Sequence, residues 1–312
     1  MLDATSKAFF HGLAQIQALQ RLASKYGMAQ GSGFARRFIA GENVQEAVAA
    51  VADLPGKGLN LTLDYLGESV ATAAEASAAT TEYLGIIQAI VASGIERNIS
   101  LKLTQLGLDV DRATAVDNMR RILEPADAHG FFVRIDMENS PYTDATIEIL
   151  DTLWRQGHKN VGTVIQSYLK RSPEDIRKLN AMGARVRLVK GAYKEPKEVA
   201  FQSKSEVDSA FVELMQVLLD GNPYPAIATH DPVMIDATKA YAKSKGYAND
   251  RFEFQMLYGI RRDLQMSLVK EGYRVRVYVP FGKQWYPYFM RRLGERPANV
   301  GFVLRGILSD RS

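Results

Sequence analysis

The chain has 312 residues, of which 46% are hydrophobic and 24% are charged, and its formal net charge is +4. This is the composition of a globular protein, long enough for one large α/β domain or two smaller ones. The absence of cysteine excludes disulfides, thiol catalysis and cysteine-ligated metal sites. No apolar run approaches the roughly 20 residues that span a bilayer, no basic segment precedes an apolar core at the N-terminus, and Lys and Arg are not gathered in runs. We therefore expect no transmembrane segment, no secretory signal and no nucleic-acid partner.

Residues 1–57 favour helices. Apolar residues recur at helical spacing over 7–25, and shorter helices are expected at 34–38 and 43–52, before residues 55–58 (PGKG) break the pattern. We predict a helical arm or cap over 1–57 and a catalytic domain over 58–312. Packing explains the apolar faces of this arm more simply than a binding partner does.

From residue 58 onward, strand-like and helical stretches alternate. The strand-like runs lie at 59–65, 99–106, 131–137, 161–169, 185–189, 226–229, 252–257 and 273–279, and Pro280 and Gly282 are expected to end the last one. Helical stretches follow them at 70–92, 112–128, 144–155, 173–181, 203–219, 233–244, 261–270 and 286–293. This alternation predicts an α/β fold with a parallel sheet, a (β/α)8 TIM-type barrel with additional N-terminal helices. A doubly wound sheet is less favoured, because no strand leads into a glycine-rich phosphate loop.

Polar side chains collect near the ends of the predicted strands, where the active site of such a barrel is built. They are Lys102, Thr104, Arg134, Asp136, Glu138, Gln166, Arg185, Arg187, Lys190, Tyr193, Thr229, His230, Asp231, Gln255 and Tyr278. Period-two alternation places Arg134 and Asp136 on one face of their strand, and Arg185 and Arg187 on one face of theirs. Charges inside a barrel must pair with one another or with a ligand. The convergence of so many polar groups on one rim favours a ligand.

The predicted C-terminal helix carries two adjacent arginines. Tyr288 precedes Arg291 and Arg292 by three and four residues, and Glu295 follows them by four and three, so all four are neighbours on a helix surface. Two guanidinium groups side by side suit a carboxylate or a phosphate. A solvated basic helix end is the alternative interpretation.

The residues alone leave the reaction open. Arg291 and Arg292, with Arg187, Lys190 and Lys102, make the rim cationic, which suits an anionic ligand such as a phosphorylated cofactor. The four histidines are dispersed, so we expect no metal site. Lys190 is an alternative candidate as a Schiff-base nucleophile.

Several motifs in chain order resemble the proline dehydrogenase family. They are residues 133–138 (VRIDME), 187–193 (RLVKGAY), 228–230 (ATH) and 288–296 (YFMRRLGER). The resemblance extends from residue 59 to Arg296, and the chain is similar in length to the single-function bacterial enzymes. It implies FAD as cofactor, and oxidation of L-proline to Δ1-pyrroline-5-carboxylate by hydride transfer from C5 to flavin N5, the first step of proline catabolism.

The resemblance also implies roles for individual residues. Asp136 and Arg187 match the catalytic positions. The implied substrate contacts are Lys102, Tyr278, Tyr288, Arg291 and Arg292, with Glu295 holding the arginines. The implied FAD contacts are Met137, Gln166, Arg187, Lys190, Gly191, Ala192, Thr229 and His230, with Tyr193 closing over the site.

The family passes electrons to a membrane quinone. Because no spanning segment is expected, the resemblance implies a cytoplasmic protein that touches the inner face of the membrane peripherally, through its N-terminal helices or basic surface. Two enzymatic alternatives remain open. One is a flavin barrel like methylenetetrahydrofolate reductase, and the other is an aldolase that uses Lys190. A barrel that only binds an anion is the non-catalytic alternative.

Overall fold

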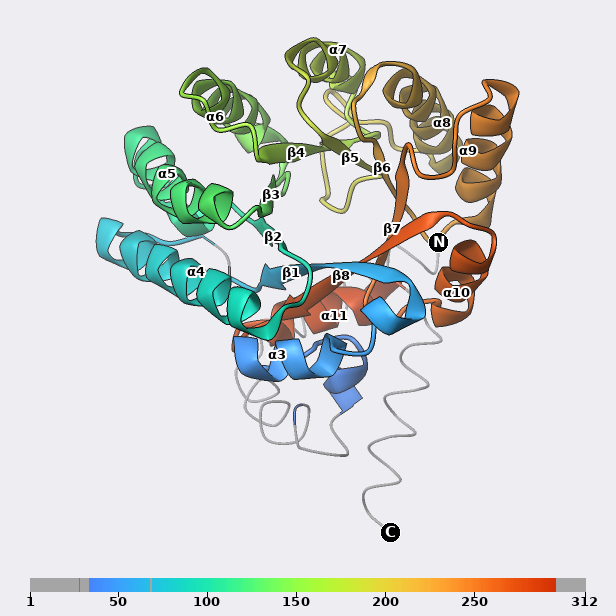
Figure 1. The fold of residues 1–312 in the computed structure, drawn as a ribbon. Helices are drawn as coiled ribbons and strands as arrows, with labels where there is room; N and C mark the ends of the chain where they lie inside the picture. Colours follow the sequence, from blue (N-terminus) through green and yellow to red (C-terminus); the bar gives the residue numbers. More distant parts are fainter. Residues whose placement is uncertain (1–27, 29–33, 68, 296–312) are drawn as a thin grey trace.

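The computed structural model describes residues 28, 34–67 and 69–295 (Figure 1). Within them, eight parallel strands form a closed barrel in sequence order, β1 to β8. The predicted (β/α)8 fold is therefore confirmed. The helix expected at 7–25 lies outside the described residues.

The strands follow the predicted runs, with differences at their ends. They are β1 (Leu59–Tyr65), β2 (Asn98–Leu101), β3 (Phe132–Ile135), β4 (Val161–Gln166), β5 (Val186–Val189), β6 (Ala226–Ala228), β7 (Glu253–Leu257) and β8 (Arg274–Phe281). β2 ends earlier than predicted, because residues Thr104–Leu106 form a 3-10 turn, η3. β4 ends at Gln166, before the three further residues that the prediction included. Lys102, Asp136 and Lys190 each follow a strand directly, at the barrel mouth.

Pro280 does not end β8 as predicted. The strand continues through Phe281, with Pro280 opposite Asp64 of β1. Pairing with β7 stops at Tyr278, so no β7 partner requires an N–H from position 280. The carbonyl of Pro280 accepts a hydrogen bond from the backbone N–H of Ala40 at 2.9 Å.

The described helices follow one another along the chain, and those over residues 73–270 surround the barrel in that order (Figure 1). They are η1 (Phe34–Arg37), α3 (Val44–Val51), η2 (Pro55–Lys57), α4 (Ala73–Ser93), α5 (Arg112–Ala128), η4 (Ser140–Tyr142), α6 (Thr143–Arg155), α7 (Ser172–Met182), α8 (Lys204–Gly221), α9 (Pro232–Ser244), α10 (Arg262–Lys270) and α11 (Trp285–Glu295). Capping interactions define the ends of several of these helices. Thr72 and Ser203 form capping boxes with Glu75 and Glu206 at the starts of α4 and α8. Gly94 ends α4 in the left-handed conformation, at φ 73°.

Two helices have roles that the sequence pattern did not predict. α3 packs on α4 and β8, and its Ala47 and Val51 belong to the main core between strands and helices. Figure 1 shows α3 beneath β1 and β8, between α4 and α10. α11, which follows β8, instead contributes Trp285, Tyr288 and Phe289 to a second cluster. The outer position beside β8 is therefore taken by α3 and not by the last helix of the repeat.

Candidate active site

The guanidinium of Arg187, on β5 at the barrel mouth, is buried. Its Nη1 donates to Asp136 at 2.7 Å, its Nη2 to Ser100 at 3.1 Å and its Nε to Gln255 at 2.5 Å. Tyr278 donates its hydroxyl to the other oxygen of Asp136 at 2.7 Å. The guanidinium also lies 5.1 Å from the centre of the Tyr278 ring. Every nitrogen of Arg187 thus has a partner, and the predicted catalytic pair, Asp136 and Arg187, is brought into direct contact.

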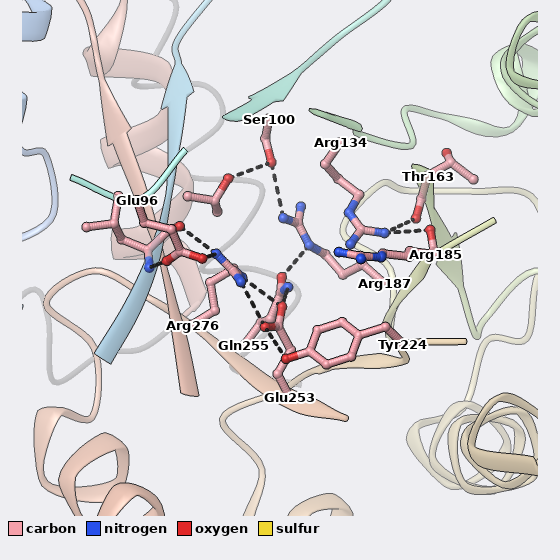
Figure 2. A network of polar contacts seen from close by, with 12 residues as sticks. Glu96, Ser100, Arg134, Thr163, Arg185, Arg187, Tyr224, Glu253, Gln255 and Arg276 are labelled. Atoms are coloured by element: carbon pink, nitrogen blue, oxygen red, sulfur yellow. Dashed lines mark hydrogen bonds and ion pairs between the residues drawn. The ribbon is translucent and has the colours of Figure 1, made fainter. Parts of the chain in front are cut away.

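A buried polar network continues from Arg187 toward the other end of the barrel (Figure 2). Gln255 donates to Glu253, and Glu253 accepts Nε and Nη2 of Arg276 at 2.8 and 3.0 Å. Arg276 also donates to Glu96 at 2.6 Å. Burial alone would raise the pKa of Glu253, but the charge and hydrogen bonds of Arg276 outweigh it, and the pKa lies below its usual value. The barrel interior, which is commonly filled with branched apolar side chains, is here partly ionic.

Arg134 lies in the same interior but makes its hydrogen bonds elsewhere than to Asp136, although strand alternation predicted the two on one face. Its Nη1 donates to the carbonyls of Thr163 and Arg185 at 3.0 and 2.7 Å. Figure 2 shows Arg134 turned toward Thr163, away from Gln255. The Arg–Asp network that sequence alternation left open is therefore made by Arg187 and not by Arg134.

Lys102 lies at the barrel mouth beside Asp64, a carboxylate that was not among the predicted site residues. Its Nζ lies 3.7 Å from Asp64, whose side chain is 1% exposed. Within the described part of the chain, neither oxygen of Asp64 accepts a hydrogen bond. Burial would lower the pKa of Lys102, but Asp64 and Asp136 raise it above its usual value, so Lys102 is a cation at neutral pH.

Lys190, directly after β5, is clamped by two carboxylates. Its Nζ lies 2.5 Å from Asp208 on α8 and 2.7 Å from Asp231, the residue that caps α9. Burial raises the pKa of both acids, but Lys190 and Lys204 outweigh it and hold both pKa values below normal. A Schiff-base lysine needs an apolar pocket or neighbouring cations. Lys190 instead pairs with two anions, which is not the environment of a Schiff-base lysine.

The remaining predicted cofactor contacts surround these cations at the strand ends. Gln166 donates its amide to the carbonyl of Glu138 at 2.9 Å, and Thr229 accepts the N–H of Asp231 at 3.0 Å. Nε2 of His230 accepts the N–H of Leu257 at 2.9 Å, so the neutral ring carries its proton on Nδ1. Met137 is buried after β3, and Ala192 is exposed after Gly191. These residues share one rim, as the sequence predicted.

Gly191 has a backbone that other residues rarely adopt, with φ 118°. A Cβ at this position would lie 2.5 Å from the ring of Tyr168. The glycine is thus required by its conformation and by packing against Tyr168. Its implied role as an FAD contact stays a prediction.

α11 brings part of the predicted arginine site to the same region. Arg291 is half-buried. The structure describes the backbone of Arg292 and Glu295 within α11 but not their side chains. Desolvation raises the pKa of Tyr193 to about 12, while the positive charges of Lys102 and Arg291 act in the opposite direction. Arg291, Lys102 and Tyr193 are therefore within electrostatic reach of one another. Tyr288 is buried beside Phe38, Trp285 and Phe289.

Two of the anions that pair with the rim cations, Asp64 and Asp208, were not predicted from the sequence. Asp64 stands in an apolar run at the end of β1, the same signal that identified Asp136. Asp208 projects from α8, and nothing in its local sequence marks it. At the described rim, Lys102, Arg187 and Lys190 each lie within 4.0 Å of a carboxylate.

Comparison with protein families matches residues 47–305 to the family described as proline dehydrogenase. The chain belongs to the proline dehydrogenase family. It is 42% identical over 302 residues to proline dehydrogenase 2 of Bacillus subtilis (strain 168), across 97% of this chain and 98% of that protein. It is 46% identical over 297 residues to proline dehydrogenase 1 of the same strain, across 95% and 97%. The resemblance seen in the motifs is confirmed.

Among solved structures, the barrel is similar to proline utilization A (PutA) from Bdellovibrio bacteriovorus inactivated by N-propargylglycine. The TM-score is 0.78 and the identity 28%, and the match covers 84% of this chain. The chain spans 32% of the length of that protein. As a member of the proline dehydrogenase family, this chain is an oxidoreductase of proline catabolism with a TIM-type barrel. No helix in the described ranges is long and apolar enough to cross a membrane.

Proposed function

We propose that this proline dehydrogenase family member oxidises L-proline to Δ1-pyrroline-5-carboxylate with FAD as its cofactor. The observation that carries the proposal is the buried Arg187, fixed by Asp136, Ser100 and Gln255 at the mouth of the barrel. A guanidinium held on all sides there is a preorganised positive charge, which stabilises negative charge that develops next to it.

The residues at the rim fit a flavin nucleotide. Arg187 and Lys190 supply positive charge, Gln166 an uncharged amide, and Thr229 and His230 neutral polar groups, a donor set suited to an anionic nucleotide with a polar ring. Met137, Gly191 and Ala192 complete the proposed FAD contacts. When bound, FAD would supply at its flavin N5 the acceptor for the hydride of proline C5.

Arg187 and Asp136 are the proposed catalytic residues. Arg187 would hold its charge beside a bound flavin. Asp136 orients Arg187 through Nη1 and accepts a hydrogen bond from the Tyr278 hydroxyl. Because Asp136 has a hydrogen bond at each oxygen, its role here is to hold partners in place. Tyr278 thereby has a fixed ring position, suited to one wall of a small substrate pocket.

The proposed substrate site binds the proline carboxylate through cations. Lys102 is kept charged by Asp64, and Arg291 lies within reach of the same region. Arg292 completes the clamp, with Glu295 steadying the two arginines. Tyr278 and Tyr288 would line the pyrrolidine ring, and Tyr193 would cover it. Charge-assisted hydrogen bonds to a carboxylate are the strong kind.

We also propose a quinone as the electron acceptor, with the protein in the cytoplasm and in peripheral contact with the inner face of the membrane. Residues 1–57 remain a proposed helical arm or cap, whose α3 packs on the 58–312 catalytic domain. Quinone reduction with vesicles present and absent, for the full chain and for a chain that lacks the first 27 residues, tests the role of that arm.

A visible absorption spectrum recorded without oxygen, before and after addition of L-proline, tests the central proposal. We expect a flavin spectrum that bleaches on addition of proline. A colourless protein, or a flavin band unchanged by proline, would contradict it. Bleaching by NADH but not by proline would favour the folate-reductase alternative. Borohydride trapping of a carbonyl substrate on Lys190 would favour the aldolase.

A further inference from the structure

Two side chains of β7 lie directly beneath Arg187 in the barrel interior. Gln255 is 3% exposed and Glu253 is 1% exposed, and they stand two residues apart on the inward face of the strand. Figure 2 shows Gln255 between the guanidinium of Arg187 and the carboxylate of Glu253. Neither side chain lies in the substrate or cofactor contacts proposed above.

The chemistry of the two neighbours fixes the orientation of the Gln255 amide. Nε of Arg187 can only donate a hydrogen bond, and an ionised Glu253 can only accept one. The amide oxygen must therefore face Arg187 and the amide nitrogen must face Glu253. The observed contacts are these two, with 2.5 Å between Nε of Arg187 and Oε1 of Gln255.

Glu253 can dictate this orientation because it remains an anion. Arg276 donates to both of its oxygens, Tyr224 donates to Oε2 at 3.1 Å, and Gln255 donates to Oε1. These four donors fill the acceptor sites of the carboxylate. A neutral group at this position would allow the Gln255 amide to turn and present its nitrogen to Arg187, where donor would meet donor.

We infer that Gln255 is a positioning residue for Arg187, and that Glu253 sets the orientation in which Gln255 does this. Asp136 and Ser100 hold the two terminal nitrogens of Arg187, and Gln255 holds the third nitrogen, at the root of the guanidinium plane. Without that third contact the plane can tilt about the other two. This inference rests on the proposed function, in which the charge of Arg187 lies beside the flavin.

The deciding variant is Gln255→Met, which has similar volume and removes the acceptor but leaves Glu253 paired with Arg276. We expect kcat with proline to fall about tenfold or more, while KM stays within about twofold, because the carboxylate clamp is intact. The flavin reduction potential should move to a lower value than in the wild type, since positive charge beside the ring favours the anionic reduced form. A crystal structure of the variant should show the guanidinium plane of Arg187 displaced, a readout that requires no flavin.

Glu253→Gln tests whether Glu253 sets the orientation of Gln255. We expect the same lower kcat and lower flavin reduction potential as in Gln255→Met. If that variant does not fold, because Arg276 is left with Glu96 as its remaining carboxylate partner, the Gln255→Met result decides. Tyr224→Phe is the matched control. It removes a donor from the oxygen of Glu253 that Gln255 does not contact, so kcat and potential should match the wild type.

Two results would overturn the inference. One is a Gln255→Met protein whose kcat, potential and Arg187 position equal those of the wild type. The other is a Tyr224→Phe protein with the same losses as Gln255→Met, which would show a general loosening of the core. Failure of the proposed function would give a different result, a wild-type protein whose visible spectrum proline does not bleach.

Discussion

Asp136, one residue beyond β3, accepts a hydrogen bond from Arg187 of β5 at 2.7 Å, and this ion pair crosses the barrel interior past β4. The two side chains are 14% and 5% exposed, so water screens the pair weakly. Tyr278 of β8 joins it from the opposite side of the mouth. Strands from three parts of the chain are therefore tied together at the proposed reaction centre.

Asp136→Asn should lower kcat for proline by about 10- to 100-fold, corresponding to about 1.4–2.7 kcal/mol in the barrier, and should raise KM less. The amide keeps the shape but loses the charge that orients Arg187. Steady-state kinetics with proline check this. Tyr278→Phe, which removes one hydroxyl donor but keeps the ring, should cost less in kcat. Unchanged turnover in Asp136→Asn would remove this residue from the catalytic set.

Arg292→Met should raise the KM for proline by about 30- to 150-fold while flavin content stays at the wild-type level, because it removes one charge-assisted contact of about 2–3 kcal/mol. Titration with proline and the flavin-to-protein absorbance ratio check the two parts. Lys270→Met, on the exposed end of α10, removes the same charge and should change neither. Loss of flavin in Arg292→Met would mean that the substrate and cofactor sites have been exchanged.

Gly191→Ala should destabilise the protein by about 1–3 kcal/mol, because φ is 118° and the added Cβ would meet the Tyr168 ring at 2.5 Å. Flavin content should fall as well, since Gly191 lies among the proposed FAD contacts. Gly85→Ala is the matched control. Gly85 lies inside α4 with nothing within 4 Å of an added Cβ, so this change should stabilise by about 0.5–1 kcal/mol. Equal stability of the two variants in urea would contradict the account of Gly191.

Lys190→Met should alter the acid limb of the stability curve. The pKa values of Asp208 and Asp231 are lowered in the folded state, so their contribution to stability is present above the unfolded value of about 3.9 and is lost as the pH falls through the lower folded value. The variant should be less stable than the wild type at pH 7. The difference in Tm should shrink as the pH falls below about 4. A difference that is constant with pH would show that Lys190 does not act through these carboxylates.

Arg276→Met should reduce the free energy of unfolding by about 3–5 kcal/mol, because it leaves the buried charge of Glu253 without its main partner. The side chains of Arg276 and Glu253 are 8% and 2% exposed. Arg155→Met breaks an ion pair with Asp151 on the surface of α6, where Arg155 is 80% exposed, and should change stability by less than about 1 kcal/mol. Urea unfolding of both variants makes the comparison. Similar values for the two would refute the buried network as a stability element.

Much of the fold follows from local sequence patterns. The alternation of β-branched runs with helical spacing identified the barrel, and polar residues at strand ends identified its rim, because a strand's side-chain direction alternates with every residue. Thr72 and Ser203 start their helices through contacts three residues away, which is also local information. The places where prediction and structure differ, such as Pro280 inside β8, depend on where the neighbouring strand stops.

The sequence by itself determined the order of strands and helices, the family and the set of polar groups at the mouth, since each is written in short segments. Only the tertiary structure decided which anion meets which cation. Asp64 faces Lys102, Asp136 meets Arg187, and Asp208 reaches Lys190 from α8. The same holds for α3, which covers β8 from far along the chain. These pairings are fixed by the closure and register of the barrel, which bring together residues that no local pattern relates.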